Sequence, residues 1–497
     1  MFKEKVLDLI LSNIKENPNA NAFCIGGKYY TYSHFGQCVS KINKALELSH
    51  NQNTKVGLVI NDDIETYASI IALWLNGYCY VPLHPHWPME RCVDICNQVE
   101  LDLILDSSKT SRYANKNVIM TMDLADEDVV LLAKEDVPDD HLAYILFTSG
   151  STGKPKGVQL TRGNLYSFID AFFELYRMDN RDRCLQCFDL SFDLSIMSYC
   201  VPLTVGACVY TVSPDVIKYT YIGALLEEEK LTFALMTPST IKYLRPFFGE
   251  IDGSSLKYSL FCGEALPFDI TEEWAKCAKN AIIDNVYGPT EDTIFCSTYR
   301  YNREGENKMH NGILSIGRPM KNCQMVVLND DNEESPVGEM GELCLSGAQL
   351  SIGYFKNEEK NKEAFFELNG IRWYRSGDVC FKDEDGDFLY SGRKDNQVKV
   401  QGFRIELGEI EYHSREISKS NTVCIANEEE GEMVLYLFIE GPVQDTKLIV
   451  DYMKSKMPLY MIPSHIQFIE SFPLNNSDKV DRPKLKKNIV KYDKSFK

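Results

Sequence analysis

Short apolar runs rich in β-branched residues alternate with helical patterns through most of the first 390 residues of the chain. Clear examples of such runs are Lys55–Ile60, Leu101–Leu105, Tyr144–Phe147 and Ala207–Thr211. Strands that alternate with helices are typical of α/β layers, in which helices pack on largely parallel sheets. The pattern therefore predicts an α/β fold built around such sheets.

The length of the chain, 497 residues, predicts more than one domain, because a single hydrophobic core of ordinary size is smaller. Near Gly341–Ser346 and Asp387–Tyr390 turn residues are frequent, which indicates a smaller β-rich subdomain. The polar segment Ser391–Asn396 then marks a boundary. We expect a large N-terminal domain of layered α/β subdomains plus the β-rich subdomain over residues 1–394, and a small α+β C-terminal domain over 395–497.

The balance of charge limits the partners of the chain. It has 53 Lys and Arg against 72 Asp and Glu, a formal net charge of −19. Such an acidic surface repels phosphate backbones, so we expect no nucleic-acid partner. A cleft can still hold the phosphates of ATP with backbone amides and magnesium.

Cysteine usage and apolar runs indicate the compartment. The 16 cysteines are scattered through apolar stretches without paired spacing, which favours small buried hydrophobes in a reducing compartment over disulfides or a zinc site. The first residues mix charged and apolar positions at helical spacing, unlike the apolar core of a signal peptide. Apolar runs stay below the roughly 18 residues that cross a bilayer. These features predict a cytoplasmic protein with no membrane insertion.

The strongest local motif is Tyr144–Val158, YILFTSGSTGKPKGV, in which an apolar strand runs into a loop of glycines, hydroxyls and lysines. Glycine lets the backbone approach closely, so successive amides can point at phosphate oxygens. The spacing differs from a Walker A loop, because two residues rather than four separate Gly150 from Gly153. The motif predicts a phosphate-binding loop with the candidate residues Thr148, Ser149, Gly150, Ser151, Thr152, Gly153 and Lys156.

Three further segments follow this loop in order: Asn285–Glu291 (NVYGPTE), Tyr374–Asp378 (YRSGD) and Gly392–Arg404. Together with the loop, they resemble the adenylate-forming superfamily, which includes amino-acid adenylation domains, acyl-CoA synthetases and luciferases. The resemblance spans nearly the whole chain and implies ATP and Mg²⁺ as cofactors. It also implies that the small C-terminal domain is mobile and moves about a hinge at Asp395.

The resemblance assigns nucleotide contacts to particular residues. Asn285 would bond the adenine amino group, and Tyr287 would stack on the adenine ring. Thr290 would touch the α-phosphate, and Glu291 would hold Mg²⁺, for which a carboxylate is a suitably hard oxygen ligand. Asp378 would accept hydrogen bonds from both ribose hydroxyls. The other nucleotide-binding residues that the resemblance implies are Arg393 and, in the segment LFCGEALP, Gly263, Glu264 and Ala265.

Lys479 is similar to the catalytic lysine of the superfamily. It would bridge the substrate carboxylate and the α-phosphate, where negative charge develops in the transition state. Thr290 and Glu291 would complete the catalytic set. The superfamily has Asn-Gly before this lysine, whereas this chain has Ser477 and Asp478.

The acyl pocket distinguishes the branches of the superfamily. An amino acid brings an α-ammonium that needs a buried counter-charge, which the amino-acid branch supplies from the aspartate of an F-D-x-S motif. The chain contains this motif twice, with Asp189 and Asp193 as candidates. The branch has a glycine-containing pair about thirteen positions after the aspartate, and Gly206 lies 206 − 193 = 13 positions after Asp193 but 206 − 189 = 17 after Asp189. The spacing favours Asp193.

The remaining pocket positions are nearly all apolar, so the substrate side chain should be uncharged. Phe295 lies where relatives that take tiny substrates also carry a large ring, which indicates alanine or glycine. The chain is most similar to the free-standing D-alanine–D-alanyl carrier protein ligases, but Leu235 and Phe295 are bulkier than expected there, so the amino acid and its handedness stay open. Each wall residue fits core packing equally well. The walls that the resemblance implies, carried over residue by residue, are Leu194, Met197, Leu235, Leu260, Cys262, Val286, Ile294 and Phe295.

The favoured function is ATP-dependent adenylation of a small amino acid (D-alanine, alanine or glycine), followed by transfer to the phosphopantetheine thiol of a carrier protein. One alternative is an acyl-CoA synthetase of a small carboxylic acid, although Asp193 would then face an alkyl chain unpaired. Another alternative is a non-catalytic relative that binds nucleotide, which the presence of Glu291, Asp378 and Lys479 disfavours.

Overall fold

The computed structural model forms two compact units. The first unit comprises Met1–Pro85, Cys96–Phe147 and Gly157–Lys394, and the second comprises His86–Ile95, Thr148–Lys156 and Asp395–Lys497. None of the helices in the described part of the chain combines the length and apolar character that crossing a membrane requires. The structure describes residues 1–49, 51–113, 115–129, 137–149, 155–212, 216–394, 397–429, 432–474 and 480–493.

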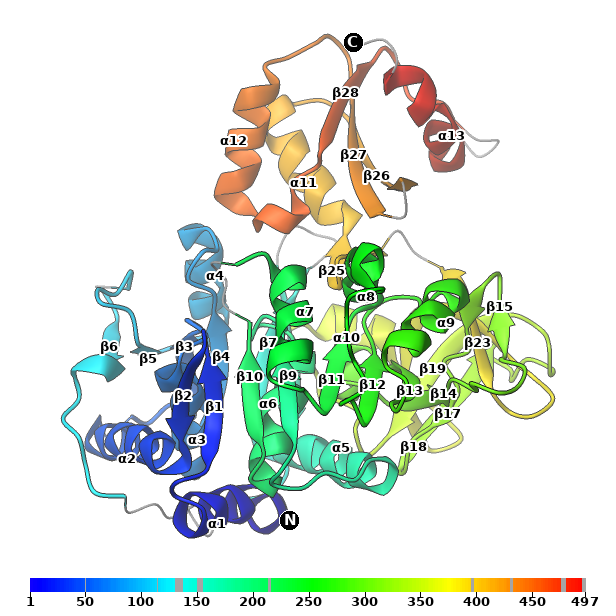
Figure 1. The fold of residues 1–497 in the computed structure, drawn as a ribbon. Coiled ribbons are helices and arrows are strands. Elements are labelled where there is room, and N and C mark those ends of the chain that lie inside the picture. The colour runs from blue at the N-terminus through cyan, green and yellow to red at the C-terminus, as the bar shows by residue number, and fades with distance from the viewer. Residues whose placement is uncertain are drawn as a thin grey trace. The chain divides into compact units, whose positions relative to one another are not determined.

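A seven-stranded sheet forms one layer of the first unit (Figure 1). Its strand order is β20-β8-β7-β4-β3-β5-β6, and β4 pairs in parallel with both β3 and β7. Its central strands are buried runs of β-branched, aromatic and other apolar residues, which suit a sheet covered on both faces. The strands are β3 Lys55–Val59, β4 Cys79–Leu83, β5 Leu103–Asp106, β6 Asn117–Met120, β7 Leu142–Thr148, β8 Lys156–Thr161 and β20 Gly353–Tyr354.

A nine-stranded sheet forms a second layer, with the order β17-β14-β13-β12-β11-β9-β10-β1-β2. The six strands from β13 to β1 pair in parallel, and antiparallel strands complete both edges. The carboxyl ends of parallel strands meet at one edge of a sheet, where ligands commonly bind. The strands are β1 Asn21–Ile25, β2 Lys28–Thr31, β9 Arg183–Gln186, β10 Cys208–Thr211, β11 Phe233–Met236, β12 Tyr258–Phe261, β13 Ile282–Tyr287, β14 Ser297–Arg300 and β17 Arg318–Pro319.

Two helices illustrate how local sequence sets the element bounds. The helix α5 begins with a capping box, in which the Thr161 side chain accepts from the backbone of Asn164 and the Asn164 side chain accepts from the backbone of Thr161. The helix α6 ends at Gly206, whose φ of 79° provides the left-handed C-cap. The α-helices up to residue 364 are α1 Asp8–Glu16, α2 Tyr32–Ser49, α3 Ile64–Leu75, α4 Met89–Val99, α5 Arg162–Leu175, α6 Asp193–Val205, α7 Lys218–Glu228, α8 Pro238–Leu244, α9 Phe268–Cys277 and α10 Glu358–Ala364.

A third, antiparallel sheet lies in the last part of the first unit. Its order is β18-β19-β22-β21, with β23 also pairing with β22, and a separate two-stranded sheet joins β15 to β16. The β-rich subdomain predicted from the sequence is therefore confirmed. The strands are β15 Met309–His310, β16 Ile313–Leu314, β18 Cys323–Leu328, β19 Gly341–Gly347, β21 Phe365–Leu368, β22 Ile371–Lys382 and β23 Phe388–Arg393.

The second unit has its own sheets and core. A hairpin pairs β24 with β25, and a three-stranded sheet has the order β26-β27-β28, antiparallel and then parallel. Its buried core includes Ile405, Ile410, Leu437, Ile449 and Met453. The elements are β24 Gln397–Val400, β25 Phe403–Glu406, α11 Leu407–Ser418, β26 Thr422–Glu429, β27 Glu432–Glu440, α12 Thr446–Lys456, β28 His465–Ile469 and α13 Arg482–Asp493.

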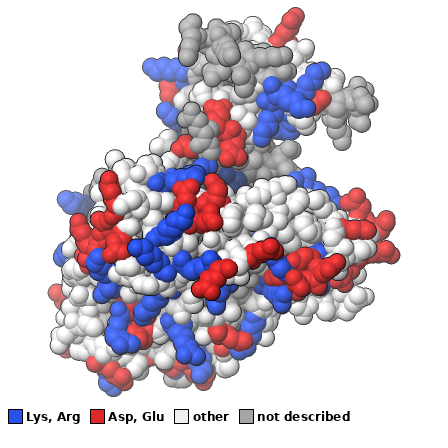
Figure 2. Space-filling model, turned by 45° about the vertical axis from the view of Figure 1, so that its right-hand side comes forward, with Lys and Arg blue, Asp and Glu red and all other residues white. Residues whose placement is uncertain are grey.

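The predicted α/β class, with largely parallel sheets, is confirmed. All 16 cysteines are buried thiols, as their scattering through apolar stretches predicts. On the face that Figure 2 shows, basic and acidic side chains are interspersed with uncharged surface.

Candidate active site

Asp193 is the first residue of α6 and is 5% exposed. Its Oδ2 accepts a hydrogen bond from the backbone N–H of Ile294, with 3.2 Å between the oxygen and the nitrogen. Burial raises the pKa of Asp193 to about 7; the hydrogen bonds from Ile294 and Thr290 lower it, and the charge of Glu291 raises it further. An ammonium group beside this carboxylate would favour its ionised form.

Asp189, the aspartate of the first F-D-x-S motif, has different surroundings. Its Oδ2 lies 2.8 Å from Nε2 of His84, and its Oδ1 accepts hydrogen bonds from the backbone and hydroxyl of Ser191. Burial tends to raise the pKa of Asp189, but the bonds from His84 and Ser191 outweigh it, and the pKa lies below its ordinary value. The structure thus places Asp193, and not Asp189, beside Thr290 and Ile294.

The central strands of the nine-stranded sheet determine which predicted wall residues share a face (Figure 1). Leu235 on β11 lies opposite Leu260 on β12, which lies opposite Asp284 on β13, so these side chains point to the same face. Asp284 accepts a hydrogen bond from the hydroxyl of Tyr176, the residue after α5, at 2.9 Å. Val286 is two residues beyond Asp284. Val286 therefore lies on this α5-covered face too.

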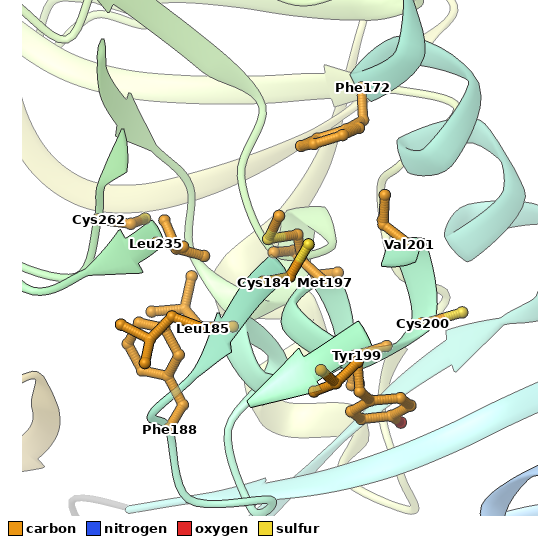
Figure 3. Packing of buried hydrophobic residues seen from close by; sticks show 14 of the residues in the cluster. Phe172, Cys184, Leu185, Phe188, Met197, Tyr199, Cys200, Val201, Leu235 and Cys262 are labelled. Atoms are coloured by element: carbon orange, nitrogen blue, oxygen red, sulfur yellow. The ribbon is translucent and has the colours of Figure 1, made fainter. Parts of the chain in front are cut away.

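The other predicted walls belong to the same buried cluster. Phe295 is fully buried and packs edge-on against Phe168 of α5, with ring centroids 4.8 Å apart and an interplanar angle of 87°. Figure 3 shows Met197 on α6, together with Leu235 and Cys262 near the ends of adjacent strands. All eight predicted walls are at most 8% exposed: Leu194, Met197, Leu235, Leu260, Cys262, Val286, Ile294 and Phe295.

Asn285 and Tyr287 lie on the opposite face of β13 from Val286, because side chains alternate along a strand. The side-chain nitrogen of Asn285 donates to the backbone oxygens of Leu314 and Ser315, at 3.3 and 2.8 Å. The amide nitrogen is thereby engaged, which makes the amide oxygen of Asn285 the atom suited to an adenine amino group.

The residues predicted to bind ribose and adenine form one buried network. The hydroxyl of Tyr287 donates to Oδ2 of Asp378, and Nη1 of Arg393 lies 3.0 Å from Oδ1 of the same carboxylate. Arg393 also donates to the backbone oxygen of Ser376 at 2.9 Å. Burial and then the charge of Asp378 raise the pKa of Tyr287 well above its ordinary value, so the hydroxyl stays a donor. The structure brings three separate predicted segments together here.

Glu291 lies in the short 3-10 turn Thr290–Asp292, at the end of the predicted adenine segment. Glu291 is fully buried, and its Oε1 accepts a hydrogen bond from the hydroxyl of Tyr354 at 2.7 Å. A hard carboxylate at this position fits Mg²⁺, which takes one or two protein carboxylates and fills its remaining positions with phosphate oxygens and water.

The segment Gly263–Ala265 follows β12, where the chain turns away from the sheet. Gly263 has a φ of 90°, a left-handed conformation that favours glycine. The carboxylate of Glu264 accepts hydrogen bonds from the backbone and the hydroxyl of Ser239, in the first turn of α8. Ala265 is exposed.

The phosphate loop is described at its two ends. Ser149 donates its hydroxyl to the backbone oxygen of Arg404 at 3.0 Å and accepts from the backbone N–H of Glu406 at 3.1 Å, within the second unit. Nζ of Lys156 lies 3.6 Å from Oε1 of Glu406. Thr148 Oγ1 is buried without a hydrogen-bond partner among the described residues. Gly150, Ser151, Thr152, Gly153, the hinge residue Asp395 and the catalytic candidate Lys479 lie outside the described residues.

Two buried residues next to this cluster escaped prediction from the sequence. Tyr354 bonds the predicted magnesium ligand, and the side chain of Gln349 donates to the backbone of the turn that follows Glu291. Gln349 follows β19 in a short glycine-containing stretch that resembles an ordinary loop, and Tyr354 ends the two-residue strand β20. The sequence signal was a polar glutamine between apolar neighbours, which is too weak to identify a partner.

Comparison with known proteins identifies the family of this chain. The AMP-binding enzyme family matches residues 11–355, so the chain belongs to this family and is an ATP-using, AMP-forming ligase. The D-alanine–D-alanyl carrier protein ligase of Bacillus licheniformis is 30% identical over 443 residues, which cover 85% of this chain and 87% of that ligase. Within the family, the chain is of the amino-acid adenylation type.

The chain matches a small part of one further relative and nearly all of another. Tyrocidine synthase 3 of Brevibacillus parabrevis is 32% identical over 450 residues, which are 87% of this chain but 7% of that synthase. The chain therefore spans less than a tenth of this relative. Among solved structures, the Vibrio cholerae adenylation domain AlmE, in complex with glycyl-adenosine-5'-phosphate, has a TM-score of 0.87 and 28% identity over 97% of both chains.

Proposed function

We propose that the chain activates a small amino acid (D-alanine, alanine or glycine) as an aminoacyl adenylate and passes the aminoacyl group to the phosphopantetheine thiol of a carrier protein. The observation that carries this proposal is the environment of Asp193. It is a buried carboxylate with a pKa raised to about 7, and it accepts hydrogen bonds from the backbone of Ile294 and from Thr290. The α-ammonium of an amino acid would supply the positive charge that this carboxylate lacks.

In the first step, a carboxylate oxygen of the amino acid attacks the α-phosphorus of ATP. The bond from that phosphorus to the oxygen bridging it to the β-phosphate breaks, and pyrophosphate leaves. Asn285 and Tyr287 would hold the adenine, and Asp378 the ribose hydroxyls. Thr290 would contact the α-phosphate, and Glu291 would hold Mg²⁺, which supplies positive charge to the phosphate oxygens.

The second step forms the thioester, with AMP as the leaving group. The small C-terminal domain, residues 395–497, would turn about Asp395 between the two steps and carry Lys479 in and out of the site. We therefore expect Lys479→Ala to abolish adenylation while pre-made aminoacyl adenylate still transfers to the carrier thiol. A variant in which pre-made adenylate reacts no better than the free amino acid would contradict this two-step arrangement.

The predicted walls support a small substrate side chain. Phe295, held against Phe168, lies on the same α5-covered side of the sheet as Leu235 and Leu260. Large apolar walls of this kind would suit a substrate side chain no bigger than a methyl group or a hydrogen atom. The D-alanine ligase relative and the glycyl-adenylate complex of AlmE support the same size class.

Substrate-dependent exchange of pyrophosphate into ATP tests this function. A panel should contain D-alanine, L-alanine, glycine, valine, phenylalanine, acetate and propionate. We expect exchange with one or more of the three small amino acids and little with the others. Preference for acetate or propionate would instead identify an acyl-CoA synthetase, and nucleotide binding without any exchange would identify a non-catalytic relative.

A further inference from the structure

Gln349 is fully buried in the segment that follows β19. Its side-chain nitrogen donates to three backbone oxygens of one turn, those of Asp292, Thr293 and Phe295, at 3.3, 3.2 and 2.9 Å. The hydroxyl of Thr293 donates in return to the backbone oxygen of Gln349. One side-chain amide group therefore engages three of the four carbonyl oxygens of residues 292–295.

The turn that Gln349 holds is strained. Thr293 has a φ of 50° and Ile294 a φ of 73°, both in the left-handed region. This conformation is a rare outlier for β-branched residues, because their side chains collide with the backbone there. Two consecutive residues of this kind persist where the surrounding structure overdetermines them. The three hydrogen bonds from Gln349 provide such a restraint.

The strained conformation has a direct consequence for the amino-acid site. It points the backbone N–H of Ile294 at Oδ2 of Asp193, 3.2 Å away. It also sets the position of Phe295, whose ring packs on Phe168. A turn in ordinary right-handed or extended geometry would direct the N–H of Ile294 elsewhere.

Gln349 is itself fixed to α5. The side chain of Asn164, in the capping box of that helix, donates to the backbone oxygens of Ala348 and Leu350, at 2.9 and 3.1 Å. These carbonyls flank Gln349 on both sides. A continuous set of hydrogen bonds thus runs from the start of α5 through Gln349 to the turn that contacts Asp193.

We infer that Gln349 is a positioning residue for the amino-acid site: it holds Thr293 and Ile294 in their left-handed conformation and so keeps the Ile294 N–H on Asp193 and the Phe295 ring in place. The inference rests on the proposed function, because Asp193 acts there as the counter-charge of the substrate ammonium. Gln349 touches neither reacting atom, so it acts through the turn.

Gln349→Met tests this role, because methionine has nearly the same length and no donor. We expect the KM for the amino acid to rise roughly tenfold, with the KM for ATP changed less than about twofold. Ser346→Ala is the matched control, since Ser346 is a buried residue of β19 whose hydroxyl bonds the backbone oxygen of Arg372 at 2.7 Å. It should leave both KM values unchanged. Should Gln349→Met not fold, Gln349→Asn should also raise the KM for the amino acid more than the KM for ATP, by a smaller factor.

A second substitution tests the strain itself. Asparagine tolerates left-handed φ and is close to threonine in volume, so Thr293→Asn should relieve the strain at the first of the two residues. In the Gln349→Met background, it should bring the KM for the amino acid back to within about threefold of wild type. Three outcomes would each overturn the inference. The KM for the amino acid could stay unchanged in a folded Gln349 variant, or both KM values could rise equally. Thr293→Asn could also fail to restore amino-acid binding. Wild-type protein without amino-acid-dependent exchange would instead refute the proposed function.

Discussion

The hydroxyl of Tyr287 donates a hydrogen bond to the carboxylate of Asp378, which lies 91 positions later in the chain. The other oxygen of that carboxylate pairs with Arg393 at 3.0 Å. The ring predicted to stack on adenine and the carboxylate predicted to hold ribose are thus fixed to each other. Such preorganisation reduces the ordering that nucleotide binding requires.

Asp378→Ala should weaken ATP binding strongly. The substitution removes the predicted ribose acceptor and leaves Arg393 without its carboxylate. Hydrogen bonds to charged groups contribute about 1.5–3 kcal/mol, so the KM for ATP should rise roughly 10- to 150-fold. Tyr287→Phe, which keeps the ring, should raise the KM for ATP by less than about tenfold. Exchange kinetics at varied ATP give both values; if the KM for the amino acid rises as much as that for ATP, the network is not specific to the nucleotide.

The pKa of Asp193 predicts how activation depends on pH. Burial raises the pKa of Asp193 to about 7, so before the amino acid binds the carboxyl gains a proton as the pH falls through that value and then lacks the charge that an α-ammonium needs. The value of kcat/KM for the amino acid, measured at saturating ATP, should therefore fall as the pH drops through about 7 and level off above it. Asp193→Asn should remove this inflection. The same inflection in the variant would assign it to another group.

The two F-D-x-S motifs should differ sharply in their response to substitution. Asp193→Ala should lower kcat/KM for the amino acid by the equivalent of about 3–5 kcal/mol, the range for breaking a buried ion pair. Asp189→Ala should be much milder, because Asp189 pairs with His84 and Ser191 rather than with the pocket. Pyrophosphate exchange measures both effects. The opposite ranking would mean that Asp189 is the ammonium ligand.

The sequence predicted the parallel sheets because their strands are short apolar runs separated by helical patterns. It also pointed to Asn285, Tyr287, Asp378 and Arg393, which the structure gathers on the first unit, although their roles stay predictions. The turn at Thr293 could not be foreseen, because a β-branched residue at a φ of 50° contradicts local preference and depends on tertiary contacts.

The bonding of Gln349 to the backbone of residues 292–295, 54 to 57 positions away, leaves no local signal either. The hydrogen bond between His84 and Asp189 is equally non-local. In each case both partners lie outside the strands, and their approach depends on the tertiary fold, which periodicity does not encode.

Phe295→Ala tests whether the pocket is small. Removing the ring should open space for valine or leucine, with a gain of roughly 1 kcal/mol for each added methylene, while activation of the small substrate falls. Phe168→Ala is the matched control, because it removes the other ring of the same pair. Both variants should lose about 3–5 kcal/mol of unfolding free energy. Only Phe295→Ala should change the preferred substrate from the small amino acid to a larger one. If activity falls in proportion for every substrate, Phe295 serves core packing and does not limit the pocket.

The pairing of Asp193 with the substrate ammonium is the central claim, and one comparison tests it most directly. Pyrophosphate exchange is measured with the small amino acid that the enzyme prefers and with the matching acid that lacks the amino group, in wild type and in Asp193→Asn. We predict that wild type favours the amino acid by more than about 100-fold, corresponding to roughly 3 kcal/mol, and that the variant favours it by less than about tenfold. An equal preference in both proteins would contradict the claim, because the ammonium would then be recognised by another group.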